Sequence, residues 1–231
     1  MRVIFLFLSL LIFLASCLNN EKEKIANSPD PDFIYYDYRV QADEEKQAVT
    51  VMLQYRFGGE DGENLLLEKP SKASLDGIEL TPDSAKQTGV FYELMKPLQS
   101  FSGKHSIVFT DSRRKEHRVD FSFEAFSLAN ELPEQIAKKP FIIQLANFPN
   151  RQSRVHLVMI DTSYTTMDVN EEVLVEDGKI PINAEMLANL SSGPITLEIL
   201  KEEDKPLKNA SREGGRLLIS YGIRREFELV E

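Results

Sequence analysis

Polar and apolar residues alternate along several stretches of the chain, and this pattern predicts β-strands. Apolar side chains recur at every second position in residues 34–40, 49–57 and 119–123, with polar residues between them. A period of two is typical of strands with one buried and one solvated face. Turn residues such as Gly58-Gly59 and Asp76-Gly77 separate the strands and favour a β-sandwich. Shorter candidate strands lie at 65–67, 73–80, 90–94 and 105–110.

The alternation stops at residues 125–140 and then returns, which predicts a second domain. The interval contains Pro133 and Pro140, and a short helical turn is expected at 133–138. Residues 155–160 have apolar side chains on both faces, as expected for a central strand. Asn183 is a plausible N-cap for one short helix that ends near Leu190. Further candidate strands lie at 141–145, 195–199, 217–221 and 227–229.

The front of the chain has the layout of a secretory signal: Arg2, then an apolar run over residues 3–14. That run is shorter than the ~20 residues that span a membrane. The following Leu14-Ala15-Ser16-Cys17 resembles the lipobox of bacterial lipoproteins, and Cys17 is the one cysteine of the sequence. The resemblance implies cleavage between Ser16 and Cys17 and a lipid anchor on Cys17. Two or more acyl chains make such an anchor durable.

The segment from Phe101 to Asp111, followed by residues 118–124, resembles the last two strands of immunoglobulin-like domains, although the disulfide and core tryptophan of antibody domains are absent. The resemblance implies an all-β chain with two tandem immunoglobulin-like β-sandwich domains. They follow a lipoprotein signal peptide and a flexible, polar tether. The predicted division is signal peptide 1–16, lipidated tether 17–32, first domain 33–126, linker 127–139 and second domain 140–231.

Charge and composition exclude some partners. The chain has 37 acidic and 27 basic residues, for a net charge of −10. This argues against nucleic acid, because phosphate contacts need clustered lysine and arginine. A lone cysteine forms no internal disulfide, so stability has to come from buried apolar area.

Catalytic and metal-binding patterns are weak. The three histidines, His105, His117 and His156, lack a nucleophile motif or metal-ligand spacing. Pairs of carboxylates arise by chance among so many acids, although a hydrolase that uses them stays an alternative. The acidic turns at 43–45 and 60–64 lack the EF-hand pattern, and calcium there is left open. We predict no enzyme activity, no metal and no cofactor.

Three other segments are candidate sites. The polar loop at 161–168 could bind a ligand through Tyr164, Met167 and Asp168. The basic hairpin tip Arg113-Arg114-Lys115 could contact lipid phosphate or another polyanion, or could simply be a soluble turn. Asp83-Ser84-Ala85 resembles the O-glycosylation sequon of exported Bacteroidota proteins, which would place a glycan on Ser84.

Taken together, the chain resembles the small envelope lipoproteins of Bacteroidota. Leu18 rather than aspartate follows Cys17, so the retention signal for the inner membrane is missing and the outer membrane is favoured, on either its periplasmic or surface face. We predict a non-enzymatic binding or adaptor module that docks an envelope protein or glycan through loops or sheet edges. A structural spacer in an envelope or secretion assembly is the main alternative.

Overall fold

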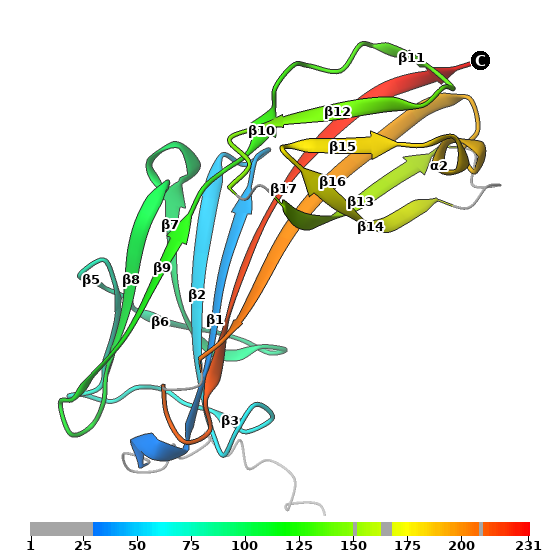
Figure 1. The fold of residues 1–231 in the computed structure, drawn as a ribbon. Coiled ribbons are helices and arrows are strands. Elements are labelled where there is room, and N and C mark those ends of the chain that lie inside the picture. Colours follow the sequence, from blue (N-terminus) through cyan, green and yellow to red (C-terminus); the bar gives the residue numbers. More distant parts are fainter. Residues whose placement is uncertain (1–29, 150–151, 163–167, 208–209) are drawn as a thin grey trace, which may run out of the picture.

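The computed structural model describes residues 30–149, 152–162, 168–207 and 210–231, and they form an all-β body (Figure 1). The residues predicted as a signal peptide, and most of the predicted tether, lie outside the described part. The described residues begin with a 3-10 turn, η1 (Pro31–Phe33), and they include a second 3-10 turn, η2 (Leu98–Ser100), and one α-helix, α2 (Ala184–Ala188). Among the described residues, no helix is long and apolar enough to cross a membrane.

The first half is a sandwich of two facing layers. One layer is part of a 13-stranded sheet, and the other is a separate sheet of four strands in the order β5-β4-β8-β9. The strands of the large layer in this half are β1 (Ile34–Asp43), β2 (Ala48–Phe57), β3 (Glu63–Asn64), β6 (Pro82–Ala85) and β7 (Gly89–Pro97). The small sheet contains β4 (Lys72–Leu75), β5 (Ile78–Glu79), β8 (Gly103–Thr110) and β9 (Glu116–Phe123).

Alternating residues of β1 and β2 supply the core of this sandwich. Tyr36 and Tyr38 are fully buried, as is Tyr55 on the neighbouring strand. The ring of Tyr55 lies 4.7 Å from that of Phe109, which comes from the opposite sheet. The polar residues between them point to the other face of the sheet, as the period of two predicts.

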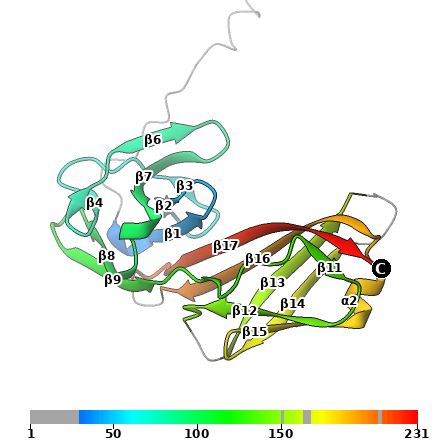
Figure 2. The same cartoon turned by 90° about the horizontal axis from the view of Figure 1, so that it is seen from above.

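The second half is a single sheet that curls on itself, with α2 at one end (Figure 2). The sheet order is β10-β12-β15-β14-β13-β16-β17. The short strand β11 pairs with the edge of β17 opposite β16. Curling lets one sheet bury its inner face, where Leu157, Val175 and Ile180 are fully buried. Its strands are β10 (Ser127–Leu128), β11 (Gln135–Ala137), β12 (Phe141–Ala146), β13 (Gln152–Asp161), β14 (Val169–Glu176), β15 (Lys179–Ile182), β16 (Gly193–Pro206) and β17 (Gly215–Val230).

Two long strands continue through both halves. The first residues of β17 pair in parallel with β1, from Gly215 opposite Tyr36 to Gly222 opposite Asp43. Its last residues, Glu228–Val230, pair with β11 of the second half. The antiparallel partner β16 accompanies β17 along most of this length. One sheet therefore carries the hydrogen-bond ladder from one half into the other.

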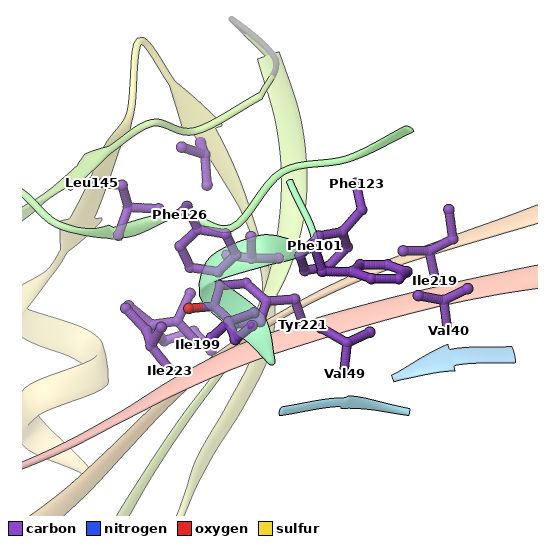
Figure 3. Close-up of a cluster of buried hydrophobic side chains, with 14 of the residues drawn as sticks. Val40, Val49, Phe101, Phe123, Phe126, Leu145, Ile199, Ile219, Tyr221 and Ile223 are labelled. Carbon is purple, nitrogen blue, oxygen red and sulfur yellow. The ribbon is translucent and has the colours of Figure 1, made fainter. Parts of the chain in front are cut away.

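Aromatic side chains fill the junction between the halves (Figure 3). The ring of Phe126 lies 5.0 Å from that of Tyr221 and 5.4 Å from that of Phe148. Tyr221 also contacts Phe123, which in turn packs against Phe101. Phe126 is only 1% exposed. The residue that follows the first sandwich is thus a core residue.

The structure confirms the all-β, sandwich-like prediction and the short helix after Asn183. The Asn183 side chain accepts a hydrogen bond from the Met186 N–H at 2.8 Å, as an N-cap does. The helical turn expected at 133–138 is wrong, because this segment contains β11, which pairs with β17. Residues 155–160 belong to β13, a central strand as expected, although Ile160 is 39% exposed on the outer face.

The predicted linker, residues 127–139, contains β10 and β11 and so is part of the sheet. The start of β17 lies in the predicted second domain, 140–231, yet it pairs with β1 of the first. Whether 33–126 and 140–231 fold independently stays a prediction, although their strands are joined in one sheet.

A candidate binding seam between two strand edges

The facing edges of β11 and β12 form a seam, defined by Gln135–Ala137 on one side and Phe141–Gln144 on the other. Within the described part of the chain, β11 pairs with β17 alone, and Phe141–Ile143 pair only with β15. A cavity of about 430 Å³ opens between the two edges, and the loop of residues 130–133 also lines it. The seam is where the curled sheet of the second half fails to close.

Backbone groups of Ile142 point into the seam. The Gln144 carbonyl accepts a hydrogen bond from the Ala129 N–H on the side away from β15, whereas the Leu145 N–H donates to Gly178 on the β15 side. Successive residues of a strand alternate in this direction. Ile142 therefore presents its N–H and C=O to the seam, where no described backbone group pairs with them.

Backbone groups of β11 face the same space. The Glu134 carbonyl accepts from the β17 backbone at 2.8 Å, and the Lys138 N–H donates to it at 2.7 Å. By the same alternation, Gln135 and Ala137 point away from β17, toward β12. The Ala137 carbonyl accepts from Lys139 in a turn. The N–H and C=O of Gln135 and the N–H of Ala137 have no backbone partner among the described residues.

The seam is apolar at its centre and acidic at its rim. Ile136 and Ile143 are 8% and 1% exposed, whereas Ile142 is 61% exposed. Glu131 lines the cavity, and its side chain is 79% exposed even though it contacts Arg225. Glu134, which precedes β11, is exposed as well. An apolar segment with a positive charge at one end is complementary to this surface.

Hydrogen bonds hold both sides of the seam in place. Ala129 is fixed to Gln144, and Glu134 to Glu228, at the two ends of the loop that lines the cavity. At the other end of the seam, the Lys138 Nζ donates to the carbonyl of Leu190 at 2.8 Å. The two edges are therefore presented by a fixed frame, so that little ordering would accompany binding.

Two other free edges of the sheet carry charges and a proline that hinder pairing, and the β12 edge of the seam does not. The edge strand β6 begins at Pro82 and continues with Asp83. The exposed end of β16 has four charged residues and a proline in Glu202–Pro206. Charges and prolines are the usual protection of edge strands. The seam edge Phe-Ile-Ile-Gln of β12 has neither.

Two of the three histidines are engaged in structural pairs with aspartates. His105 lies 2.8 Å from Asp76 and stacks on Phe101, and His117 lies 2.9 Å from Asp111. His156 is exposed and stands apart from them on β13. In the described residues, no group of three or more potential ligands could hold a metal ion.

The densest charged cluster surrounds Asp37 on the outer face of β1. Its fully buried carboxylate contacts Arg39 at 3.0 Å, Arg56 at 2.9 Å and Arg216 at 3.0 Å. Burial disfavours the charge of Asp37, but hydrogen bonds from Arg216 and Arg39 outweigh it and lower the pKa of the carboxyl. Arg216 comes from β17, so the cluster ties that strand to β1 and β2 in the large sheet.

Comparisons with known proteins find distant structural likenesses alone. No family model matches the chain, and no curated protein matches it. A structure of DIP-gamma IG1+IG2 covers 87% of this chain and 97% of its own, at 8% identity and a TM-score of 0.25. A Titin-A168169 structure covers 86% of this chain and 99% of its own, at 10% identity and a TM-score of 0.25.

The third likeness is to SGBP-B of the Bacteroides ovatus mixed-linkage glucan utilization locus, in complex with a mixed-linkage heptasaccharide. It has 12% identity and a TM-score of 0.26, and covers 86% of this chain and 60% of that one. TM-scores this low do not establish a shared arrangement of the whole molecule.

The sites predicted from sequence are spread over the molecule. Ser16, Cys17, Tyr164 and Met167 lie outside the described residues, and Asp168 is exposed just before β14. Ser84 is exposed on the edge strand β6, where its N–H bonds to Asp83. The three basic residues Arg113, Arg114 and Lys115 form the exposed turn between β8 and β9. None of the described ones lines the seam.

Reasoning from the sequence missed the seam, because Gln135 and Ala137 fall within the predicted linker. One signal was available: Phe141, Ile142 and Ile143 are consecutive apolar residues directly after Lys138-Lys139-Pro140. Such a run marks an apolar strand but does not show that one of its edges is free.

Proposed function

We propose that this protein is a lipid-anchored, non-enzymatic binding module of the bacterial envelope that takes up an extended segment of another envelope protein as an added strand in the seam. The observation that carries the proposal is the set of unpartnered backbone groups on Gln135, Ala137 and Ile142, which face one another across an apolar cavity. Strand addition uses such groups for affinity and the neighbouring side chains for specificity.

The sequence supports the anchor. A short apolar leader, a lipobox-like ending and one cysteine at the required position together favour lipidation of Cys17. The outer membrane is the proposed location, because Leu18 replaces the aspartate of the retention signal. A binding role without catalysis is supported by the histidine–aspartate pairs, which hold the ends of the small sheet in place.

The seam sets the chemistry of the segment that fits it. The free edge of β12 covers three residues, Phe141–Ile143, or about 10 Å at ~3.3 Å per residue. A short extended segment with β-branched apolar side chains matches Ile142, Ile143 and Ile136. A lysine or arginine beside it would meet Glu131 and Glu134.

A random twelve-residue peptide library, selected on the purified full chain, tests the proposal. We expect enrichment of alternating apolar sequences with a flanking basic residue. Binding should protect the Gln135, Ala137 and Ile142 amides from hydrogen exchange. Ile142→Pro removes an N–H that takes no part in the β15 ladder, and we expect it to weaken the selected peptide at least tenfold.

The matched control is Ile142→Thr, which keeps both the backbone N–H and a β-branched side chain. We expect it to retain most of the affinity. Equal enrichment on the wild-type and Ile142→Pro proteins, or exchange protection elsewhere, would contradict the proposal. Absence of any enrichment would instead support a spacer role.

A further inference from the structure

Three segments bring exposed aromatic rings and cations together at the end of the molecule opposite the seam. They are η1 with the end of β2, the turn between β8 and β9, and the connection from β16 to β17 (Figure 1). Gly215 of β17 pairs with Tyr36 at this end, and Val230 pairs with β11 at the other. Fifteen steps of strand separate these two residues, or up to about 50 Å.

Two phenyl rings form the apolar part of this surface. Phe33 and Phe57 are 36% and 38% exposed, and their ring centroids lie 6.3 Å apart. The Gly58 N–H donates to the Phe33 carbonyl at 2.9 Å and fixes the two residues beside each other. The Arg212 guanidinium lies 5.4 Å from the centroid of the Phe33 ring. Arginine on an exposed ring can reach a lipid phosphate while the ring enters the interface.

The turn between β8 and β9 adds the remaining cations. The buried carboxylate of Asp111 accepts from the N–H groups of Arg113 and Lys115 and from His117, which holds the turn rigid. Arg113 pairs with Asp30, the residue that caps η1, at 2.9 Å. This ion pair places the turn next to the point where the described chain begins.

Three cations of this end have no carboxylate partner among the described residues: Arg114, Lys115 and Arg212. The acids that lie near them are partly engaged, since Asp30 pairs with Arg113 and Glu60 with Arg216. Asp32, Asp61, Glu63, Glu116 and Glu213 also lie on or beside these segments, so the end is not a positive field and its acids outnumber its unpaired cations. It is a set of separate cations beside two rings, which fits individual phosphate groups at a membrane surface.

We infer that this end, formed by Phe33, Phe57, Arg114, Lys115 and Arg212, is the membrane-facing surface of the protein and contacts lipid phosphates. The inference rests on the anchor in the proposed function. Thirteen residue-to-residue steps lead from Cys17 to Asp30, so Asp30 lies within about 45 Å of the lipid whatever path the chain takes. Contact here directs the seam away from the membrane, toward partners.

A single tryptophan tests the inference, because the chain has none of its own. Phe57→Trp places the probe on the proposed surface, and Ile142→Trp places a matched exposed probe at the seam. Each full-length protein is reconstituted in phosphatidylglycerol-containing vesicles with brominated acyl chains. We expect at least twofold quenching of the tryptophan at position 57 and little change at position 142.

Charge reversal provides the second readout. Arg114→Glu with Lys115→Glu should abolish most of the quenching at position 57. The equally large charge change Arg154→Glu with Lys179→Glu, in the second half, should not. Equal quenching at positions 57 and 142, or quenching that survives the first pair of changes, would overturn the inference.

Palmitate labelling of the same preparations separates this test from that of the anchor. Loss of labelling on Cys17→Ser is expected from the proposed function. Labelled protein without quenching at position 57 would overturn the membrane-facing surface and leave the anchor intact. If the wild-type protein carries no palmitate label, the proposed lipid anchor is wrong. Preferential quenching at position 57 would in that case still support the proposed membrane-facing surface.

Discussion

At the scale of single residues, Asp37 shows how a charge can be kept in a chain that has no disulfide. Its carboxylate is fully buried, but the three arginines that contact it remain 19–30% exposed at their side chains. The arginines shield the aspartate and stay in touch with water, so the desolvation penalty falls mainly on one group. In the strand pattern, Asp37 was simply a polar residue on the solvated face.

Asp37→Asn should lower the free energy of unfolding by about 1–3 kcal/mol at pH 7, because the arginines would lose the anion that offsets their mutual repulsion. The pKa of Asp37 is lowered from 3.8 in the folded state. Its stabilising effect is therefore complete above that ordinary value and is lost as the pH falls through the lowered one. Urea titrations of wild type and Asp37→Asn at pH 7, 4.5 and 3 measure how this stabilisation depends on pH.

Asp120→Asn is the control, because its partner Arg118 and the aspartate itself are both more than 60% exposed. We expect no measurable change in the free energy of unfolding there, because solvent screens an exposed pair. If the difference in the free energy of unfolding between wild type and Asp37→Asn stayed constant from pH 7 to pH 3, this account of the cluster would be wrong.

At the scale of elements, β17 determines the arrangement more than any other strand. It pairs with β1, β11 and β16, and its Tyr221 lies within the aromatic junction. Burial raises the pKa of Tyr221 to about 12, with a contribution from Glu44, so the phenol stays neutral at physiological pH. Gly215 is needed where β17 meets β1, since a Cβ there would lie 2.5 Å from the Tyr36 carbonyl oxygen.

Phe126→Ala tests the junction at this scale. We expect a loss of about 3–5 kcal/mol in the free energy of unfolding, because a fully buried ring leaves a cavity between Tyr221 and Phe148. Ile160→Ala, at an exposed apolar position of the outer face, should change it by less than about 1 kcal/mol. Urea titration compares the two, and similar losses in both would show that the junction adds little.

At the scale of the whole molecule, the continuous sheet makes the two halves mechanically dependent. Strands β16 and β17 cannot leave one half without breaking the ladder of the other. The proposed membrane-facing end and the seam lie at opposite ends of β17. If the proposal holds, this continuous strand would hold the seam at a fixed height above the lipid.

We expect the described body to unfold in one cooperative transition, because separating the halves would expose the aromatic junction and break the pairing of β1 with β17. Calorimetry of the full chain should give a calorimetric enthalpy equal to the van't Hoff enthalpy. Limited proteolysis should correspondingly leave residues 127–139 uncut until global unfolding. Two resolved transitions, or two protected fragments from early cleavage near 125–139, would support independent domains.

The sequence by itself determined the strand content of this protein, because side-chain burial in a strand depends on a local period of two. It placed β1, β2, β9 and the Asn183 cap, and it predicts the leader and the lipidation of Cys17, which lie outside the described residues. The tertiary structure alone decided which strands are neighbours. The pairing of Tyr36 with Gly215, and the open edges at Gln135 and Ile142, depend on contacts between residues far apart in the chain. Strand alternation carries no information about which edge stays free, so the seam could be found only from the folded molecule.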